Sequence, residues 1–495
     1  MAEPVPAVPP PTRQPVSDNP LRLSAQGASP FPPIASYGFL SDCHTAALVA
    51  PDGSVEWLCL PTFDAPSVFG TLLDRSAGSF RIAPYGVEVP AARRYDPGTM
   101  ILESTWMTPT GWLVVRDALT IGPWHDDGHE TSHTRPADDH DADHLLVRTV
   151  ECIQGKVAVE LICEPNFEYG TRTATWERGS DEDERGHYHL DAKDGDRTAF
   201  RLFSDLRPGI EGNRTRSRHV MQEGERRFAA LSWTHELQGP RTVEQADEYH
   251  ARTRHFWRSW LAHGDFPDHP WRGYLQRSAL TLKGLTYQPT GALVAAPTTS
   301  LPETPGGERN WDYRFCWMRD AAFALWGLHA LGLDWEAEDF LQFVADLERN
   351  EDGSLQIMYG IRGQRDLTER TIDHLKGYEN ARPVRVGNDA FSQRQNDVYG
   401  AVLDSVYIHT KRTDHIPERL WPVLYDQVEC ACERWREPDQ ARDLCERLLS
   451  HAGSLYLYAE ELQACSGRHL GNYPQAFTHL ALINAVSHVI ADASR

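Results

Sequence analysis

The pattern of apolar and polar positions divides the chain into a strand-rich first half and a helix-rich second half. In the first half, runs such as 45–50, 54–60, 144–153 and 156–164 are apolar throughout or alternate apolar and polar residues, as strands do. Turn residues separate these runs, and no helical pattern lies between them. The spacing therefore predicts an antiparallel β-sandwich over residues 31–240.

Helical periodicity takes over after residue 240. Residues 241–270 read as a helical linker between domains, and beyond it apolar residues recur at helical spacing. The predicted helices are 271–287, 320–331, 336–349, 394–410, 419–436, 441–450 and 473–490. An all-α domain of this kind over 271–495 forms a bundle, a solenoid or a toroid, and the lack of a short repeat argues against the solenoid.

Composition and charge narrow the class of partner. The 495 residues suffice for two or three domains, and we expect the proline-rich residues 1–30 to form a disordered tail. A net charge of −22 opposes binding to nucleic acid or to an anionic membrane, because both are negative. No apolar run approaches the roughly 18 residues that span a membrane. A neutral small-molecule substrate fits better.

Cysteine usage predicts a cytoplasmic protein. The nine cysteines are scattered and odd in number, which is typical of buried thiols in a reducing compartment. The start of the chain lacks the apolar core of a secretory signal. Cys430 and Cys432 form a C-x-C, but no second pair lies nearby, which argues against zinc.

Two polar inserts interrupt the strand-rich half, and both read as solvated loops. Residues 122–144 are dense in His and Asp, and residues 178–186 are acidic. In the first insert His125, His129 and His133 recur every fourth residue, a spacing that would align metal ligands on a helix. The glycine, the proline and the dense charge in that stretch favour a flexible loop instead, so we expect no metal there.

The segment 310–327 carries the densest chemistry. Trp311 and Trp317 offer flat apolar faces, and Arg319 with Asp320 offers charge-assisted hydrogen bonds, which together are what a sugar pocket requires. Asp312, Tyr313 and Arg314 lie among them. The same residues are also compatible with a buried helix start that contains a structural ion pair. The residues alone leave both interpretations open.

Two further segments carry polar groups at loop-to-helix transitions. Residues 378–400 contain Arg385, Asn388, Gln393, Gln395 and Asp397, which suit either a pocket rim or ordinary turns and caps. Residues 457–485 contain Glu460 and Glu461 on a loop between apolar helices. A carboxylate there would serve as a general base if the loop lined a pocket, whereas adjacent glutamates also end solvated helices.

Taken together, these segments resemble glycoside hydrolase family 15, which groups glucoamylases, glucodextranases and a bacterial trehalase branch. Residues 36–74 resemble the opening of its β-sandwich domain. Residues 310–323, 383–400 and 467–485 resemble its barrel motifs in the family's order. The sequence is most similar to the trehalase branch, above all in residues 467–485.

The resemblance implies a β-sandwich, a linker and an (α/α)6 six-hairpin barrel that performs inverting hydrolysis of an α-glucosidic bond, with trehalose as substrate. It assigns Arg319 and Asp320 to the hydroxyls of the non-reducing glucose and Glu460 to the general base. The substrate-binding residues that it implies are Trp311, Trp317, Arg319, Asp320, Arg385, Asn388 and Gln395. The trehalase branch also implies phosphate and Mg²⁺, for which this sequence shows no ligand set.

The general acid does not carry over. In the family it is a Glu that follows a W-x-x-P-D stretch, and here WREPD (435–439) runs at Gln440 directly into sequence that the family places much later. The barrel therefore reads as internally truncated at the Gln440/Ala441 join. Glu437 and Asp439 lie beside that join, but nothing in the sequence assigns the acid's role to either.

Two functions follow from this pattern. The first is an α-glucosidase that converts trehalose to two glucose molecules, and the second is a catalytically inactive relative that retains sugar binding only. Phosphorolysis fits poorly, because it would keep the acid and dispense with the base, and a pure interaction scaffold has no positive feature behind it. An incomplete barrel would also expose apolar faces, which favours a homo-oligomer.

Overall fold

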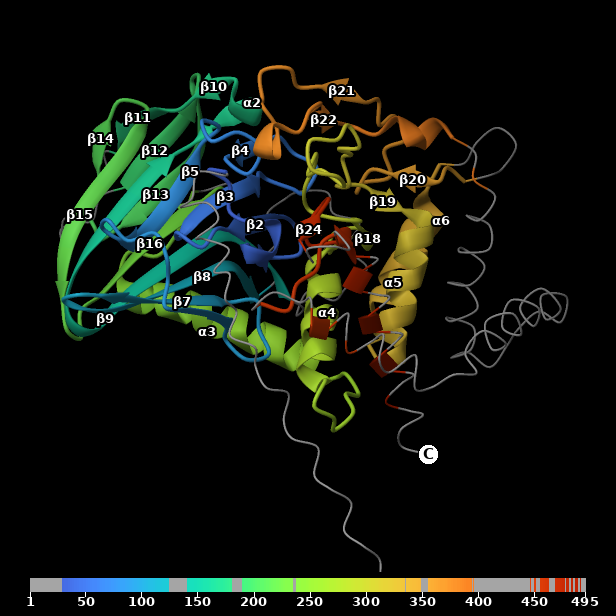
Figure 1. Cartoon of the computed structure of the whole chain (residues 1–495), viewed down its shortest axis with the longest axis horizontal. Helices are drawn as coiled ribbons and strands as arrows, with labels where there is room; N and C mark the ends of the chain where they lie inside the picture. Colours follow the sequence, from blue (N-terminus) through green and yellow to red (C-terminus); the bar gives the residue numbers. More distant parts are fainter. Residues whose placement is uncertain are drawn as a thin grey trace, which may run out of the picture.

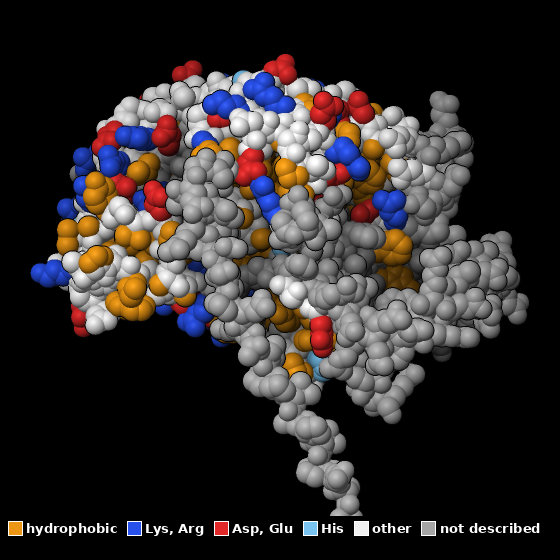
Figure 2. Space-filling view, in the orientation of Figure 1, with side chains coloured by type: hydrophobic (Ala, Val, Ile, Leu, Met, Phe, Trp, Pro, Cys, Tyr) orange, Lys and Arg blue, Asp and Glu red, His pale blue; other side chains and the backbone are white. Residues whose placement is uncertain are grey.

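The computed structural model describes residues 29–123, 140–179, 189–234, 237–333, 335–348, 355–393, 395, 446, 449–450, 455–462, 468–476 and single positions from 478 to 490. All structural statements below concern these residues. Figure 1 shows the strand-rich half on the left of the molecule, α4 near the middle, and α5 and α6 on the right. In Figure 2 acidic and basic side chains intermix along the upper rim of the same face.

The first half forms two antiparallel layers. One layer contains β1 (Gly38–Ser41), β2 (Ala46–Val49), β3 (Ser54–Cys59), β4 (Ser67–Phe69), β5 (Ser79–Pro84), β14 (Gly209–Glu211) and β15 (Arg214–Gln222). The other contains β6 (Ala92–Tyr95), β7 (Leu102–Thr108), β8 (Gly111–Pro123), β11 (Thr175–Arg178), β12 (His189–Asp194), β13 (Arg197–Ser204) and β16 (Arg226–Ser232). β1 and β5 pack against β7 and β8, so the inner faces share one core.

One strand, β9 (His140–Glu164), belongs to both layers. Its first part pairs with β8 and β16, and its second part pairs with β5 and β15. The runs 144–153 and 156–164, predicted as separate strands, are therefore one strand of 25 residues. Gly155 joins them with a φ of +70°, and a Cβ there would lie 2.3 Å from the Thr110 carbonyl oxygen. Only glycine fits this approach.

The expectation that residues 122–144 form a loop is wrong at both ends. β8 extends to Pro123 and β9 begins at His140, with Pro123 opposite His140 and Gly122 opposite Asp141. Ile121 faces Ala142, and both are buried, so the hairpin core continues into the polar insert. His125, His129 and His133 lie outside the described residues, as does most of the acidic insert.

The predicted helices near 243, 272, 320 and 336 are present as α3 (Val243–Leu261), α4 (Arg272–Gly284), α5 (Met318–Ala330) and α6 (Trp335–Asp346). The Thr242 side chain caps α3 by accepting from the Gln245 amide. α3 lies along β8, β9 and β16, whereas α4, α5 and α6 contact one another in succession (Figure 1). These are the four helices of twelve or more residues within the described ranges, so the (α/α)6 barrel is not confirmed.

Short elements complete the described chain. They are η1 (Ile34–Ser36), α2 (Phe167–Gly170), β10 (Arg172–Thr173), β17 (Thr286–Tyr287), β18 (Ala292–Leu293), β19 (Cys316–Trp317), β20 (Met358–Tyr359), β21 (Arg370–Thr371), η2 (Tyr378–Asn380), β22 (Arg385–Val386), η3 (Asp389–Ser392), β23 (Glu461–Leu462) and β24 (His469–Leu470). The predicted helices 394–410 and 419–436 lie outside the described residues. Within the described part, no helix is long and apolar enough to cross a membrane.

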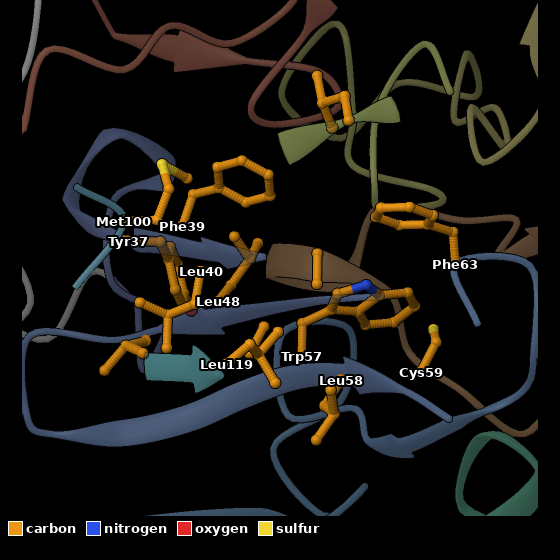
Figure 3. Close-up of a cluster of buried hydrophobic side chains, with 14 of the residues drawn as sticks. Tyr37, Phe39, Leu40, Leu48, Trp57, Leu58, Cys59, Phe63, Met100 and Leu119 are labelled. Carbon is orange, nitrogen blue, oxygen red and sulfur yellow. The ribbon is translucent and has the colours of Figure 1, made fainter. Parts of the chain in front are cut away.

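The two halves share a continuous apolar core. Figure 3 shows Trp57 among the aromatic and aliphatic side chains of β1, β2 and β3, with its indole nitrogen turned toward the second half. That nitrogen donates to the Pro297 carbonyl oxygen at 2.7 Å. Tyr473 donates to the Tyr37 carbonyl oxygen at 2.9 Å, and the Ser41 hydroxyl donates to the Gly284 carbonyl oxygen at 2.6 Å. Hydrogen bonds as well as a shared core therefore join the first half to the second half.

Asp42 holds the turn between β1 and β2 through its carboxylate. Burying that carboxylate in its charged form lowers the stability of the fold, so the stability depends on pH. Its Oδ1 accepts from the amides of His44 at 3.0 Å and Thr45 at 2.8 Å, while its buried Oδ2 has no hydrogen-bond partner among the described residues. Burial raises the pKa of Asp42 to about 6, against the lowering effect of His44. The folded state thus binds this proton more tightly than the unfolded chain.

We expect the Asp42→Asn variant to gain stability relative to the parent protein as pH rises from 4.5 to 7.5. The stabilisation from the protonated carboxyl is complete below the unfolded pKa and is lost as pH rises through about 6. The gain between these two pH values should be roughly 2 kcal/mol, because one pKa unit corresponds to about 1.4 kcal/mol and part of the effect is already lost at pH 4.5. Chemical denaturation of both proteins at the two pH values measures it. An equal difference at both values would contradict the assignment.

Candidate functional site

The segment before α5 alternates between buried and part-exposed side chains. Trp311, Tyr313 and Trp317 are part-exposed, whereas Asp312 and Arg314 are fully buried. From 311 to 314 the chain is extended, so successive side chains point to opposite sides, and Thr299 bridges to Asp312 in antiparallel fashion. One side of the segment thus presents aromatic groups, and the other side anchors it.

The anchor is the ion pair between Asp312 and Arg314. The guanidinium donates from Nε to Oδ1 at 2.9 Å and from Nη2 to Oδ2 at 2.7 Å. Asp312 also accepts from the Gly387 amide at 3.1 Å. Burial lowers the pKa of Arg314. The charge of Asp312, its hydrogen bonds to the guanidinium and the nearby Tyr169 together outweigh burial, so the pKa of Arg314 is raised well above its ordinary value. Asp312 and Arg314 thus form a buried ion pair of the structural kind that the sequence left open, and this pair lies just before the start of α5.

On the part-exposed side, Tyr313 is held by a carboxylate. Its hydroxyl donates to Glu460 Oε1 at 2.5 Å. Burial raises the pKa of the Tyr313 phenol far above its usual range, and the negative charge of Glu460 raises it further. The phenol therefore remains protonated and donates, and a hydrogen bond of this kind favours the ionised carboxylate. Sequence analysis placed Tyr313 in the segment but missed this partnership, because the two residues are far apart in the chain.

The backbone that carries Glu460 is held against the same segment. Its amide donates to the Asn472 carbonyl oxygen at 3.1 Å, and its Oε2 accepts from the Asn472 amide at 3.3 Å. The Asn472 side chain donates to the Trp311 carbonyl oxygen at 3.0 Å. Gly471 has a φ of +75°, and a Cβ there would lie 2.6 Å from Glu460 Oε2. Glycine at 471 is therefore required for this position of the carboxylate.

Arg319 and Asp320 begin α5. Arg319 Nη2 lies 3.4 Å from Asp320 Oδ2, and about a third of the Arg319 side chain is exposed. Asp320 lies in the first turn of α5, where the helix dipole stabilises a negative charge. The Trp317 ring meets the Tyr313 ring edge to face, with centroids 6.3 Å apart. The start of α5 therefore carries the Arg319–Asp320 pair, and the Tyr313 and Trp317 rings lie just before it.

In the 385–395 segment, Arg385 contacts an aromatic ring of the site, and Asn388 holds the backbone of the 311–314 segment. The Arg385 guanidinium lies 4.5 Å from the centroid of the Trp311 ring, a cation–π contact, and pairs with Glu369 at 2.7 Å. Asn388 is buried, donates to the Asp312 carbonyl oxygen at 3.1 Å and caps η3 by accepting from the Ala390 amide. Gln395 donates to Gln393. The structure therefore brings Arg385 to Trp311 and gives Asn388 a backbone-holding position.

The arrangement supplies one carboxylate with a phenol donor, a pair of indoles and a part-exposed Arg/Asp pair. Such a set can hold a polyhydroxylated ring and activate a water beside it. Within the described ranges, no three His, Cys, Asp or Glu side chains gather to hold a metal. Glu437, Asp439 and the Gln440/Ala441 join lie outside the described residues.

Comparisons with known proteins place these residues in a wider context. Residues 270–446 match the sequence profile of glycosyl hydrolases family 15, and residues 23–123 match a trehalase-like N-terminal profile. A trehalase of Mycolicibacterium smegmatis is 43% identical over 634 aligned positions, which cover 96% of this chain and 95% of that protein. A trehalase of Mycobacterium tuberculosis is 43% identical over 96% of this chain and 91% of its own length.

More distant proteins match over less of their length. A trehalase of Thermoplasma volcanium is 31% identical, and the match covers 83% of this chain and 62% of that protein. A crystal structure of a bacterial glucoamylase complexed with acarbose aligns with a TM-score of 0.45 and 11% identity. That alignment covers 67% of this chain and about half of the glucoamylase chain (52%).

We expect the Arg314→Met variant to lose roughly 3–5 kcal/mol of unfolding free energy, because it leaves the Asp312 carboxylate buried without its partner. The matched control is Arg94→Met, since the Arg94 side chain is 73% exposed in its pair with Glu103. That exposed pair should contribute less than about 1 kcal/mol. Denaturant unfolding of the three proteins compares them. Equal losses for the two variants would show that the buried pair is not an anchor.

Proposed function

Because this chain belongs to the glycosyl hydrolases of family 15, we propose that its site binds trehalose and hydrolyses it to two glucose molecules with inversion. The observation that carries the proposal is the Glu460 carboxylate held at 2.5 Å by the Tyr313 hydroxyl, on the aromatic side of the 311–320 segment. Two trehalases that are 43% identical over 96% of the chain support this substrate.

In this proposal each group has one task. Arg319 and Asp320 hold the hydroxyls of the glucose whose C1 is attacked. Trp311 and Trp317 line the subsite for that ring. Glu460 accepts a proton from a water that attacks C1 from the face opposite the glucosidic oxygen. The C1–O bond breaks as the new bond forms, so each trehalose yields one β-glucose and one α-glucose. The leaving oxygen takes up a proton at the same time.

We propose that the group which would supply that proton is missing from this chain. The alignment with the M. smegmatis trehalase has 634 positions, whereas 96% of this 495-residue chain is about 475 residues, so about 160 positions of that protein face no residue here. Internal gaps that add up to this many positions support the truncation that the sequence indicates at Gln440/Ala441. Without a general acid the leaving oxygen takes its proton from water, which costs roughly 10²–10⁴-fold in rate.

The same gap favours a second candidate function, sugar binding without turnover. The residues that hold the ring lie in segments that the chain retains, whereas the acid would lie in the segment that it lacks. In that case the site recognises an α-glucoside and releases it unchanged. Measuring binding and glucose release on one preparation separates the two functions.

We also propose a cytoplasmic location and a small-molecule substrate. Four cysteines, Cys59, Cys152, Cys163 and Cys316, are free and buried in the described part of the chain, which suits a reducing compartment. No step of the proposed reaction passes through phosphate or Mg²⁺. A homo-oligomer remains a proposal that follows from the incomplete helical half.

The Glu460→Gln variant should bind trehalose like the parent protein but release glucose at least 100-fold more slowly, because the amide cannot accept the proton of water. Isothermal calorimetry measures binding, and proton NMR follows the β-anomer in the first minutes. Glu177→Gln on the sheet domain is the control and should match the parent protein. Trehalose binding by the parent protein without any β-glucose would instead establish the second function.

Restoring the missing segment should raise the rate on trehalose. Inserting the corresponding residues of the M. smegmatis trehalase between Gln440 and Ala441 supplies an acid and closes the helical half. We expect kcat to rise by 10²–10⁴-fold. A parallel insertion with every Glu and Asp of the segment changed to Gln and Asn controls for the structural effect. A rise of equal size in both proteins would contradict the missing-acid proposal.

A further inference from the structure

We propose that Arg314 is a positioning residue through which the sheet domain aligns Tyr313 with Glu460. It acts by fixing the extended segment on which Tyr313 stands. The inference rests on the proposed role of Glu460, but its structural part can be measured without turnover.

The sheet domain presents an unusual turn to Arg314. In α2, Glu168 and Tyr169 adopt positive φ values of 49° and 57°, and Gly170 follows at 88°. Two consecutive non-glycine residues in the left-handed region are costly, and such conformations persist only where surrounding contacts enforce them. Figure 1 shows α2 at the edge of the sheet domain that faces β21 and β22. The turn therefore projects toward the second half of the molecule.

Tyr169 makes two contacts across that boundary. Its hydroxyl accepts from Arg314 Nη2 at 3.0 Å, and its carbonyl oxygen accepts from His374 Nε2 at 2.8 Å. A third contact from the sheet domain is the Ala65 carbonyl oxygen, which accepts from Arg314 Nη1 at 2.9 Å. The strained turn and the 61–66 loop thus bind one guanidinium from two directions. The planar fork of arginine suits this geometry, whereas the single ammonium of lysine does not.

From Arg314 the contacts continue into the site. The Arg314 guanidinium holds Asp312, and Asp312 is tied in turn to the Gly387 amide. Tyr313 lies between these two anchored residues and points to the other side. Its position is therefore set by the buried pair on either side of it. A shift of the pair away from the sheet domain would move the Tyr313 hydroxyl from its 2.5 Å contact with Glu460.

This arrangement predicts separate effects on rate and on binding. Arg319 and Asp320 belong to α5 and not to the extended 311–314 segment, so their grip on the sugar hydroxyls should be unchanged. Misalignment of the proposed base by a fraction of an ångström lowers kcat. Loss of the Tyr313 hydrogen bond also destabilises the ionised carboxylate, which moves the acid limb of the pH–rate profile to higher pH.

The test uses Tyr169→Phe, which removes only the hydroxyl, and Arg314→Lys, which keeps the charge. The matched control is Tyr95→Phe, because the buried Tyr95 hydroxyl also bonds across the sheet domain, to the Phe39 backbone at 2.8 and 2.9 Å. Proteins labelled with 3-fluorotyrosine report the Tyr313 environment by fluorine NMR, with the signal assigned from Tyr313→Phe. Thermal unfolding confirms that each variant is folded.

We expect Tyr169→Phe and Arg314→Lys to move the Tyr313 signal, to lower kcat at least tenfold and to change KM less than twofold. Tyr95→Phe should leave all three unchanged. An unmoved Tyr313 signal in both variants, or an equal movement in Tyr95→Phe, would overturn the proposal. If the parent protein turns over no trehalose, the proposed hydrolysis fails, whereas the fluorine signal still decides the positioning role.

Discussion

The arrangement of the site depends on one buried ion pair, between Asp312 and Arg314. Removing two charges from water is expensive, and the cost is offset only when every donor and acceptor is satisfied. Here Asp312 receives the Gly387 amide, and Arg314 reaches Tyr169 and Ala65 in the sheet domain. Three segments distant in sequence must therefore meet at one point before the pair is favourable. The aromatic side of the 311–320 segment is a consequence of that meeting.

Much of the fold could be predicted because local patterns agree with it. The apolar runs at 45–50 and 54–60 contain β2 and β3, and the periodicity near 243, 320 and 336 corresponds to helices. The prediction was wrong where a local signal had a non-local cause. A glycine between two apolar runs indicates a turn, and Gly155 was interpreted in this way. Its positive φ instead lets a single strand cross between the two layers. The charged ends of the 122–144 insert read as loop, but cross-strand pairing extends the hairpin into them.

The site was predicted as a set of residue types rather than as an arrangement. Sequence motifs brought Trp311, Arg319 and Glu460 into one list, but a list does not say which side chains share a face. Alternation along the segment separates the anchoring Arg314 from its neighbours, and that pattern was available in the sequence. The contact between Tyr313 and Glu460 was not, because 147 residues separate them and only the fold closes that distance.

The continuity of β9 also governs how the sheet domain reaches its folded state. Its partners lie between residues 79 and 232, so the ladder closes only after distant parts of the chain have come together. Contacts of such large sequence separation slow folding. Because β9 is continuous, it also links the two layers covalently within a single strand. The α2 turn that holds Arg314 packs against β4, which belongs to the layer that the second part of β9 completes.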